Sequence, residues 1–499
     1  MVWVFLGCME LTQLNALKSD PKELIAKITA NSFTDPDAAK QYEPENHKIM
    51  DKPQRVSPEI VKDGQGEPIM QKDANGNDTD KPQISNKYFD VCKVPSVIQK
   101  QIVDWAVQIA AGVPVELSTY KTELSTDEQL MFNMLQKTLR DNKMAYLDQH
   151  ILRLVSIHKI CAEIWYREEA PGFWDEIAPG SQKFKMRLVV LSPETGDDLY
   201  PVKDNMGKMI ALGRKYISLN EDGKEINKFD LFTSESIQTY TEAQGNWIEE
   251  PAITLSYGKA NFIVHQQPKT EWEDVQTKIE RIEQLDSSVG DQNELSGTPL
   301  LAVTGEVLDF GPYNGTGKVF NLSGENAGLK YVEPAGAHEA IEFERNNLLK
   351  DVFDGTNTPK ISFDDAQGFG ANIPGITLKL LFLPATLKAM GKQSGGWGMS
   401  VQRRYNFLMY AMATINSKLV KVREMEVVPR FSIYLPSNTT EEWGNIVKLV
   451  EAGLMSKKTA IQQIGLVEDP EAEWAAIQEE AKALAAAAPP PIMPVEQKK

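Results

Sequence analysis

The sequence predicts an α+β fold that is divided among several domains. Apolar residues recur at helical spacing over residues 97–110, which predicts an amphipathic helix that stops at Gly112. Over residues 184–265 the pattern changes to short β-rich runs separated by turn residues. Helical spacing returns at Trp272, and 499 residues are enough for two to four domains. Successive regions of helix and sheet of this kind are typical of α+β proteins.

Composition and charge limit the classes of function. Apolar residues make up 41% and charged residues 25%, which is typical of a globular protein that folds in water. The formal net charge is −17, whereas a protein that binds DNA by neutralising phosphates usually has a basic balance. Cys8, Cys92 and Cys161 stand far apart, which excludes a disulfide framework and a cysteine-rich zinc site and suits a reducing cytoplasm. No stretch approaches 18 uninterrupted apolar residues, so we expect no contact with a membrane.

Residues 1–87 are predicted to form an N-terminal arm that is largely irregular. Residues 31–90 are rich in Asp, Asn, Pro, Gly and Lys and lack apolar periodicity. The next region, residues 88–268, is predicted to be a mixed helix and sheet domain. Its expected helices are at 97–110, 126–140 and 145–165, and its expected strands include 186–191, 237–240 and 261–264.

A helix with one narrow apolar stripe is predicted at residues 269–295. Its apolar residues, which recur among charged ones, are Trp272, Val275, Ile279, Ile282 and Leu285. Such a helix buries one face only. Short strands expected at 299–304, 318–322 and 329–332 predict a small α/β insert over residues 296–335, and residues 336–354 predict a second, acidic helix.

Residues 355–374 predict a long loop, because they contain Gly355, Gly368 and Gly370 and no apolar repeat. A loop of this length inside a compact protein is usually functional or disordered. Pro374 suits the first turn of a helix, so a long helix is expected at 375–424, kinked at Pro384 and at residues 395–398. A strand is expected at 425–436, three helices within 437–488, and a disordered tail at 489–499.

Motifs that would indicate catalysis are incomplete. Residues 311–319 are similar to a phosphate loop, but Val319 replaces the Ser or Thr that binds magnesium. Residues 73–80 have the composition of a calcium loop, but Ile84 stands where the bidentate Glu is needed. His338-Glu339 lacks the second histidine of a zinc protease. We therefore predict no catalytic residue, no cofactor and no metal site.

The order of these elements resembles that of the portal proteins of tailed bacteriophages, over roughly residues 88–484. The run IQKQIVDWAVQIAAGVPVEL is similar to an early helix of that family that ends in Gly-x-Pro-Val. Residues 272–305 are similar to its stem helix entering the clip. The run PGITLK resembles the Ser-Gly-Ile-Ala-Leu-Lys start of the helix after its tunnel loop, with Pro374 for Ser and Thr377 for Ala. Residues 450–459 and 467–470 are similar to its crown helices.

The resemblance implies a portal-like subunit. The wing would be residues 88–268, the stem helices 269–295 and 336–354, the clip 296–335, the tunnel loop 355–374 and the crown 437–488. It implies a ring of twelve copies at one capsid vertex, through which double-stranded DNA is packaged and ejected, with no enzymatic activity. The implied partners are the major capsid protein, the scaffolding protein, the large terminase subunit and a head–tail adaptor. The implied location is the virion, after assembly in the cytoplasm of a host bacterium.

Two groups of residues are candidates for function under this resemblance. The tunnel-loop residues expected to face DNA are Phe363, Asp364, Asp365, Gln367, Gly368, Phe369, Gly370 and Asn372. The basic residues expected to contact DNA or a neighbouring subunit are Lys379, Lys388, Lys392, Arg403 and Arg404. The acidic chain suits a conduit, because a wall that repels phosphates lets DNA slide.

A second hypothesis from another class stays open. The chain could be a large cytoplasmic enzyme whose acidic active-site lid is formed by residues 354–373. The two hypotheses differ in mass, since the ring would have about twelve times the 55.8 kDa of one chain and the enzyme would be a small oligomer.

Overall fold

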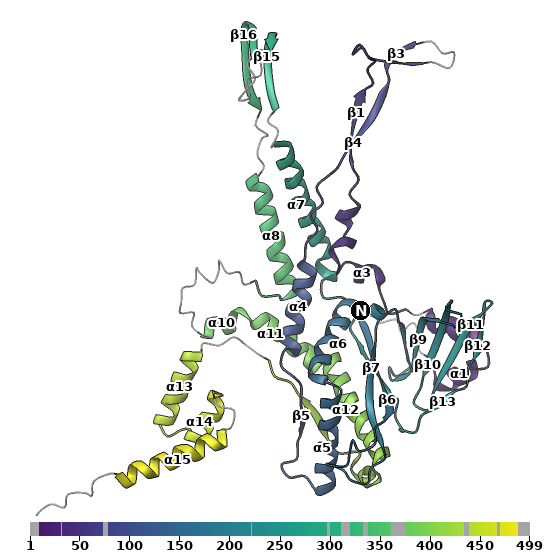
Figure 1. Ribbon diagram of the computed structural model, residues 1–499, viewed down its shortest axis with the longest axis vertical. Helices are drawn as coiled ribbons and strands as arrows, with labels where there is room; N and C mark the ends of the chain where they lie inside the picture. Colours follow the sequence, from purple (N-terminus) through teal and green to yellow (C-terminus); the bar gives the residue numbers. More distant parts are fainter. Residues whose placement is uncertain are drawn as a thin grey trace, which may run out of the picture. The chain divides into compact units, whose positions relative to one another are not determined.

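The structure is a computed structural model, and it describes most of the chain (Figure 1). The chain divides into two compact units. The first is Met1–Lys360 with Pro384–Tyr434, and the second is Ile361–Leu383 with Leu435–Lys499. Both helices and strands occur throughout the first unit, so the predicted α+β class is confirmed. The described residues are 9–30, 32–72, 78–220, 222–296, 300–310, 320–332, 338–360, 375–433, 439–466 and 470–487.

The prediction of a largely irregular arm over residues 1–87 is wrong for its described part. Three helices and four strands form there, because Asp20 and Asp35 cap helices that begin with proline and because the strands pair by backbone hydrogen bonds without a core. These elements are α1 (Leu11–Leu17), α2 (Pro21–Thr29), α3 (Pro36–Lys40), β1 (Arg55–Ile60), β2 (Met70–Lys72), β3 (Asp78–Pro82) and β4 (Ile84–Phe89). Two single turns, η1 (Pro44–Asn46) and η2 (Lys48–Asp51), lie between α3 and β1.

A six-stranded antiparallel sheet forms the outer part of the wing. Its order is β12-β11-β10-β9-β8, and β13 pairs with β11. Leu14 of α1 and Leu24 of α2 pack on this sheet against Phe229 and Tyr240, and all four are fully buried. The strands are β8 (Asp198–Lys203), β9 (Met209–Leu219), β10 (Glu225–Phe232), β11 (Ser236–Ala243), β12 (Asn246–Glu249) and β13 (Ile253–Thr254).

A second sheet, in the order β14-β6-β7, is next to the wing helices. The prediction of one helix over 145–165 is wrong, since the helix ends at His158 and a strand begins at Ile160 after left-handed Lys159. Residues 160–165 are buried on both faces of the strand, and such a continuous apolar run does not distinguish a strand from a buried helix. The elements are α4 (Ile98–Ala111), β5 (Glu116–Thr119), α5 (Thr126–Asp141), α6 (Met144–His158), β6 (Ile160–Glu169), β7 (Phe184–Leu191) and β14 (Phe262–Gln266).

Two long antiparallel helices lie in the predicted stem, α7 (Gln276–Ser296) and α8 (His338–Thr356) (Figure 1). Ion pairs join them from Lys278 to Asp351 at 2.9 Å, from Arg281 to Glu344 at 2.9 Å, and from Arg345 to Asp286 at 2.6 Å. Beyond them β15 (Leu300–Phe310) and β16 (Phe320–Val332) pair as one antiparallel hairpin. The described part of the clip is therefore a hairpin of two long strands, not three short strands in an α/β insert.

The predicted long helix at 375–424 is divided into three helices and a 3-10 turn. The first break falls just before Pro384, as expected from its missing N–H, and the second falls at Gly395. A Cβ on Gly398 would lie 1.7 Å from the Gln393 carbonyl oxygen, so glycine is required there. The elements are α10 (Gly375–Leu381), α11 (Leu383–Ser394), α12 (Gly396–Ile415) and η5 (Ser417–Val422), followed by β17 (Val427–Arg430), which pairs with β5.

The described part of the second unit contains three helices after α10, within residues 437–488. They are α13 (Thr439–Glu451), α14 (Lys457–Ile464) and α15 (Pro470–Ala487). Ser456 caps α14 by accepting a hydrogen bond from the Thr459 N–H at 3.2 Å. Among the described residues, no helix is both long enough and apolar enough to span a membrane.

An ionic cluster lies in the wing core and joins α12, α6, β6 and β14. Arg404 has no exposed surface, and its guanidinium lies 2.8 Å from Asp148 and donates to Glu163 at 2.9 Å. His265 contacts the same Glu163 carboxylate at 2.6 Å. Burial acts to raise the pKa of Glu163, but the charges of Arg404 and His265 outweigh it and hold this pKa at about 2. The expectation that Arg404 contacts DNA or a neighbouring subunit is therefore wrong.

We expect Arg404→Met to destabilise the wing strongly. The substitution leaves Asp148 and Glu163 buried without their cation, which typically costs about 3–5 kcal/mol. Urea unfolding of the two chains measures this difference. The neighbouring exposed Arg403 provides a matched control, because Arg403→Met removes the same charge from the same helix. Equal stability of the two variants would contradict a structural role for the cluster.

Candidate functional site

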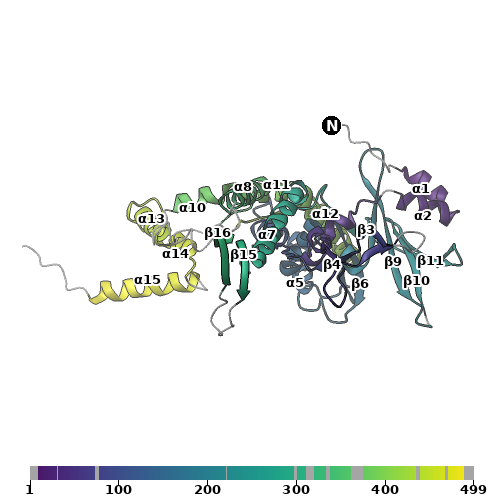
Figure 2. The same cartoon turned by 90° about the horizontal axis from the view of Figure 1, so that it is seen from above.

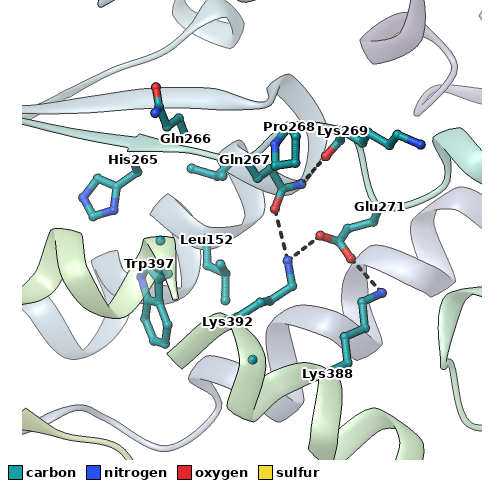
Figure 3. Close-up of a pocket in the computed structure, with 13 residues that line it drawn as sticks. Leu152, His265, Gln266, Gln267, Pro268, Lys269, Glu271, Lys388, Lys392 and Trp397 are labelled. Atoms are coloured by element: carbon teal, nitrogen blue, oxygen red, sulfur yellow. Dashed lines mark hydrogen bonds and ion pairs between the residues drawn. The ribbon is translucent and has the colours of Figure 1, made fainter. Parts of the chain in front are cut away.

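One polar cluster holds the base of the stem against α11 (Figure 3). Lys388 and Lys392 lie one turn apart on α11, and both contact Glu271, which stands shortly before α7. The Lys388 ammonium is 2.7 Å from the Glu271 carboxylate. Lys392 also donates a hydrogen bond to the Gln267 side-chain oxygen at 3.1 Å. Only 5% of the Glu271 side chain is exposed, so both ion pairs are largely shielded from water.

The position of Glu271 is set by the end of α6. After β14, the Gln267 N–H donates to the Lys159 carbonyl at 2.9 Å, and the Glu271 N–H donates to the Ser156 carbonyl at 3.2 Å. Trp272, which follows, is 1% exposed. The carboxylate is thus fixed at the point where the wing continues into the stem.

The position of α11 is fixed from the opposite side. Gln393, near its end, donates a hydrogen bond to the Ala110 carbonyl at the end of α4, at 2.8 Å. At the start of α12, Trp397 packs on Phe431 with ring centroids 5.0 Å apart, and Ser400 donates to the Val264 carbonyl at 3.0 Å. The two lysines therefore project from a helix that is itself held in the wing.

Lys388 also binds the first residues of the predicted tunnel loop, where α8 ends. Its ammonium donates to the Thr356 carbonyl at the end of α8, at 2.8 Å. The hydroxyls of Thr356 and Thr358 lie 2.8 Å apart, and the Thr358 N–H donates to the Phe353 carbonyl at 2.9 Å. Lys388 thus joins the end of α8 to α11 within the first unit.

A cavity of about 420 Å³ lies beside this cluster (Figure 3). Its lining includes Leu152, Val155, His265, Gln267, Lys392 and Trp397. Burial acts to raise the pKa of Glu271, but Lys392 and Lys388 outweigh it and hold this pKa at about 2, so the carboxylate is charged at neutral pH. Within the described ranges, no group of three or more His, Cys, Asp or Glu residues is placed to hold a metal ion. The arrangement joins α11 by ion pairs to the residue Glu271, shortly before α7.

The structure describes only part of the residues predicted as functional. The tunnel-loop candidates Phe363, Asp364, Asp365, Gln367, Gly368, Phe369, Gly370 and Asn372 lie outside the described residues. Of the basic candidates, Lys379 lies exposed on α10 in the second unit, and Arg403 is exposed on α12. Lys388 and Lys392 are paired inside their own subunit. A contact of these two lysines with DNA or with a neighbour stays a prediction.

Sequence reasoning missed Glu271 as the partner of both lysines. It is one of 70 acidic residues, and no spacing or motif distinguishes it from the others. Its place directly before Trp272, where the apolar stripe of the stem begins, is the one signal that could have indicated a junction.

We expect Glu271→Gln to loosen α11 from the stem. The substitution leaves two lysines close together with little water, at a cost of about 3 kcal/mol in the free energy of unfolding at pH 7. Hydrogen exchange should rise in α11 and in residues 352–358. Lys269→Gln is the control, because its ion pair with Asp274 is exposed and should matter little.

The effect should depend on pH with a defined sign. The pKa of Glu271 is depressed from 4.5 to about 2, so its contribution is complete above about pH 5 and is lost as the pH falls toward 2. The stability difference between the natural chain and Glu271→Gln should therefore shrink in acid. A difference that stays constant from pH 7 to pH 2, or no difference at all, would contradict the assigned ion pairs.

Comparison with solved structures finds chains of low sequence identity. One is described as the virion of a native gene transfer agent particle, with 9% identity, 74% of this chain and 89% of that chain covered, and a TM-score of 0.37. Another is described as the neck of an empty gene transfer agent particle, with 10% identity, 74% and 90% covered, and a TM-score of 0.38. No curated protein sequence matches the chain.

The match to a protein family covers far more of the sequence than any single motif does. The family model described as "Phage portal protein, SPP1 Gp6-like" matches residues 57–486. This range extends from β1 in the N-terminal arm through the wing, stem, clip and α10–α12 to the last helix, α15. The chain therefore belongs to the SPP1 Gp6-like family of phage portal proteins.

Proposed function

We propose that twelve copies of the chain form a ring at one vertex of a phage capsid. Double-stranded DNA would pass through this ring during packaging and again during ejection. The observation that carries the proposal is the family match over residues 57–486. The ring would belong to the virion and would assemble in the cytoplasm of a host bacterium, with no catalytic step of its own.

The charge of the chain supports a conduit. Each subunit has a formal net charge of −17, so a ring of twelve carries a large excess of negative charge. DNA has one charge about every 1.7 Å of its axis, and a basic wall would hold it in deep, salt-dependent minima. An acidic wall exerts little attraction on the phosphates, which favours sliding over binding.

Two segments are proposed to meet partners inside and outside the channel. Residues 355–374 would face the DNA, and support comes from Lys388, which holds the start of this segment through the Thr356 carbonyl at the end of α8. The β15–β16 hairpin, connected to both stem helices, would dock the large terminase subunit and later the head–tail adaptor. The wing would contact the major capsid protein and the scaffolding protein during assembly.

The enzyme hypothesis has less support. Its lid would be residues 354–373, of which the structure describes 354–360. In that part, Thr356 and Thr358 bond to each other and to helix carbonyls, which is a helix-end arrangement.

Shortening the tunnel loop tests the DNA-facing assignment. Removing a few residues between Phe363 and Asn372 should leave oligomer assembly intact, because Lys388 holds the end of α8 that precedes the deletion, and should abolish packaging of DNA into heads. A deletion of the same length in the tail after residue 489 is the matched control. Packaging at the natural level by the loop variant would contradict the assignment.

Replacing the clip hairpin tests the docking assignment. A short flexible linker in place of residues 300–332 should leave the wing melting temperature unchanged, because the described residues of the wing core come from the N-terminal helices and the wing strands. The variant should lose binding to the large terminase subunit, measured with the purified proteins. Retained binding would place the docking surface elsewhere, most simply on the acidic wing.

A further inference from the structure

The two-stranded ribbon formed by β1 and β4 has one apolar face and one polar face. Its six residue pairs run from Arg55 opposite Phe89 to Ile60 opposite Ile84. Because side chains alternate along a strand and residues directly opposite share a face, the pattern sorts into two sets. The apolar face holds Val56, Pro58, Ile60, Ile84 and Tyr88, with Asn86 among them. The other face holds Arg55, Glu59, Ser85, Lys87 and Phe89, where Lys87 pairs with Glu59 at 3.5 Å.

The apolar face of the ribbon has no cover from the described part of its own chain. Val56 is 47% exposed, Ile60 48%, Ile84 55% and Tyr88 61%. A ribbon of two strands is at best marginally stable alone in water, and an exposed apolar patch of this kind usually marks a contact with another protein. The ribbon is therefore incomplete within one subunit.

The base of the ribbon is nevertheless firmly attached to α7. The chain before β1 and the chain after β4 both bind two acidic residues of this helix, Glu283 and Asp291. The four contacts are His47 to Glu283 at 2.6 Å, Ser96 N–H to Glu283 at 2.9 Å, Lys52 to Asp291 at 2.9 Å and Cys92 N–H to Asp291 at 2.7 Å. Glu283 is 1% exposed, so these contacts are not loose surface pairs. Such attachment directs the ribbon to one side of the stem.

The side that bears the ribbon is opposite to the side that bears α8. Successive residues of a helix advance by about 100°, which places Glu283 and Asp291 well away from Lys278 and Arg281, the residues that pair with α8. The two views agree that α7 lies between the ribbon and α8 (Figures 1 and 2). The stem thus has two different flanks, one with the ribbon and one with the outer face of α8.

The outer face of α8 carries a large apolar side chain that is also uncovered. Phe343 is 71% exposed and lies about 180° around the helix from Val352, which is fully buried. In a closed ring of identical copies every contact is head-to-tail, so one flank of each copy meets the opposite flank of the next. The ribbon on one flank of a copy could therefore meet Phe343 on the opposite flank of the next copy.

We propose that the apolar face of the ribbon packs on α8 of the adjacent copy, over Phe343. This inference rests on the proposed ring, and it names a contact that closes it. The occupant is a second copy of this chain because the ribbon and the α8 surface flank the same helix, α7, and each carries large apolar side chains without cover, Phe343 on α8 and four residues on the ribbon. The ribbon would thereby gain the packing that it lacks in one subunit, and each copy would bind the next around the ring.

Cross-linking of cysteine pairs in the full-length chain tests the contact. Phe343→Cys is combined with Ile84→Cys or with Tyr88→Cys, and each pair is treated with a short bis-maleimide after the mass of the oligomer has been measured. The expected result is a ladder of linked subunits on a denaturing gel. The control combines Phe343→Cys with Lys87→Cys, whose side chain is on the polar face of the same ribbon, and should lose the ladder. The chain without substitutions gives the background from its native cysteines.

Each outcome bears on a different claim. A ring that forms without the ladder, or with equal ladders for Ile84→Cys and Lys87→Cys, overturns the ribbon contact and leaves the ring in place. Ribbon cysteines that link only to capsid or scaffolding protein in co-assembled heads also overturn it. A chain that stays monomeric contradicts the proposed function and, with it, this inference.

Discussion

The stem helix α7 is too polar to be held by apolar packing alone, and the first unit is organised around this constraint. Its apolar residues form a single stripe, and its other described contacts include several ion pairs. Glu283 and Asp291 bind the two legs of the N-terminal ribbon, and Lys278 and Arg281 bind α8. Immediately before the helix, Glu271 binds α11. The N-terminal arm, α8 and α11 are thus all joined by ion pairs to α7 or to the residues shortly before it.

Several basic residues of this acidic chain also form ion pairs inside the subunit. Arg404, Lys388 and Lys392 each neutralise carboxylates that are buried or nearly buried. These three positive charges are paired inside the subunit, and the net charge of the chain stays at −17. This agrees with the proposed role as a DNA conduit, since the wall of a conduit must be rigid yet must not bind phosphates strongly. The wing cluster and the stem cluster differ in position but rest on the same kind of pairing.

The sequence predicted those elements whose signals are local. The bounds predicted for α5 agree with the structure within one residue, because this helix has a serine cap and a clear 3.6-residue pattern. The end of α6 was missed because residues 160–165 are buried on both faces and have no period. The ribbon was missed because its apolar residues alternate with charged and polar ones and are not buried in a core of the same chain. Glu271, Glu163 and Glu283 could not be singled out, since a buried carboxylate and an exposed one look alike in sequence.

The central claim is the proposal that copies of this subunit close into a ring, with residues 355–374 of each copy facing the channel. A cryo-electron microscopy reconstruction of the purified full-length chain, refined without imposed symmetry, tests it most directly. The account predicts a closed ring with repeated copies, in which the segment between α8 and α10 faces the central axis and α7 lies between its own ribbon and its own α8. A small oligomer, or a ring in which that segment faces outward, would contradict it.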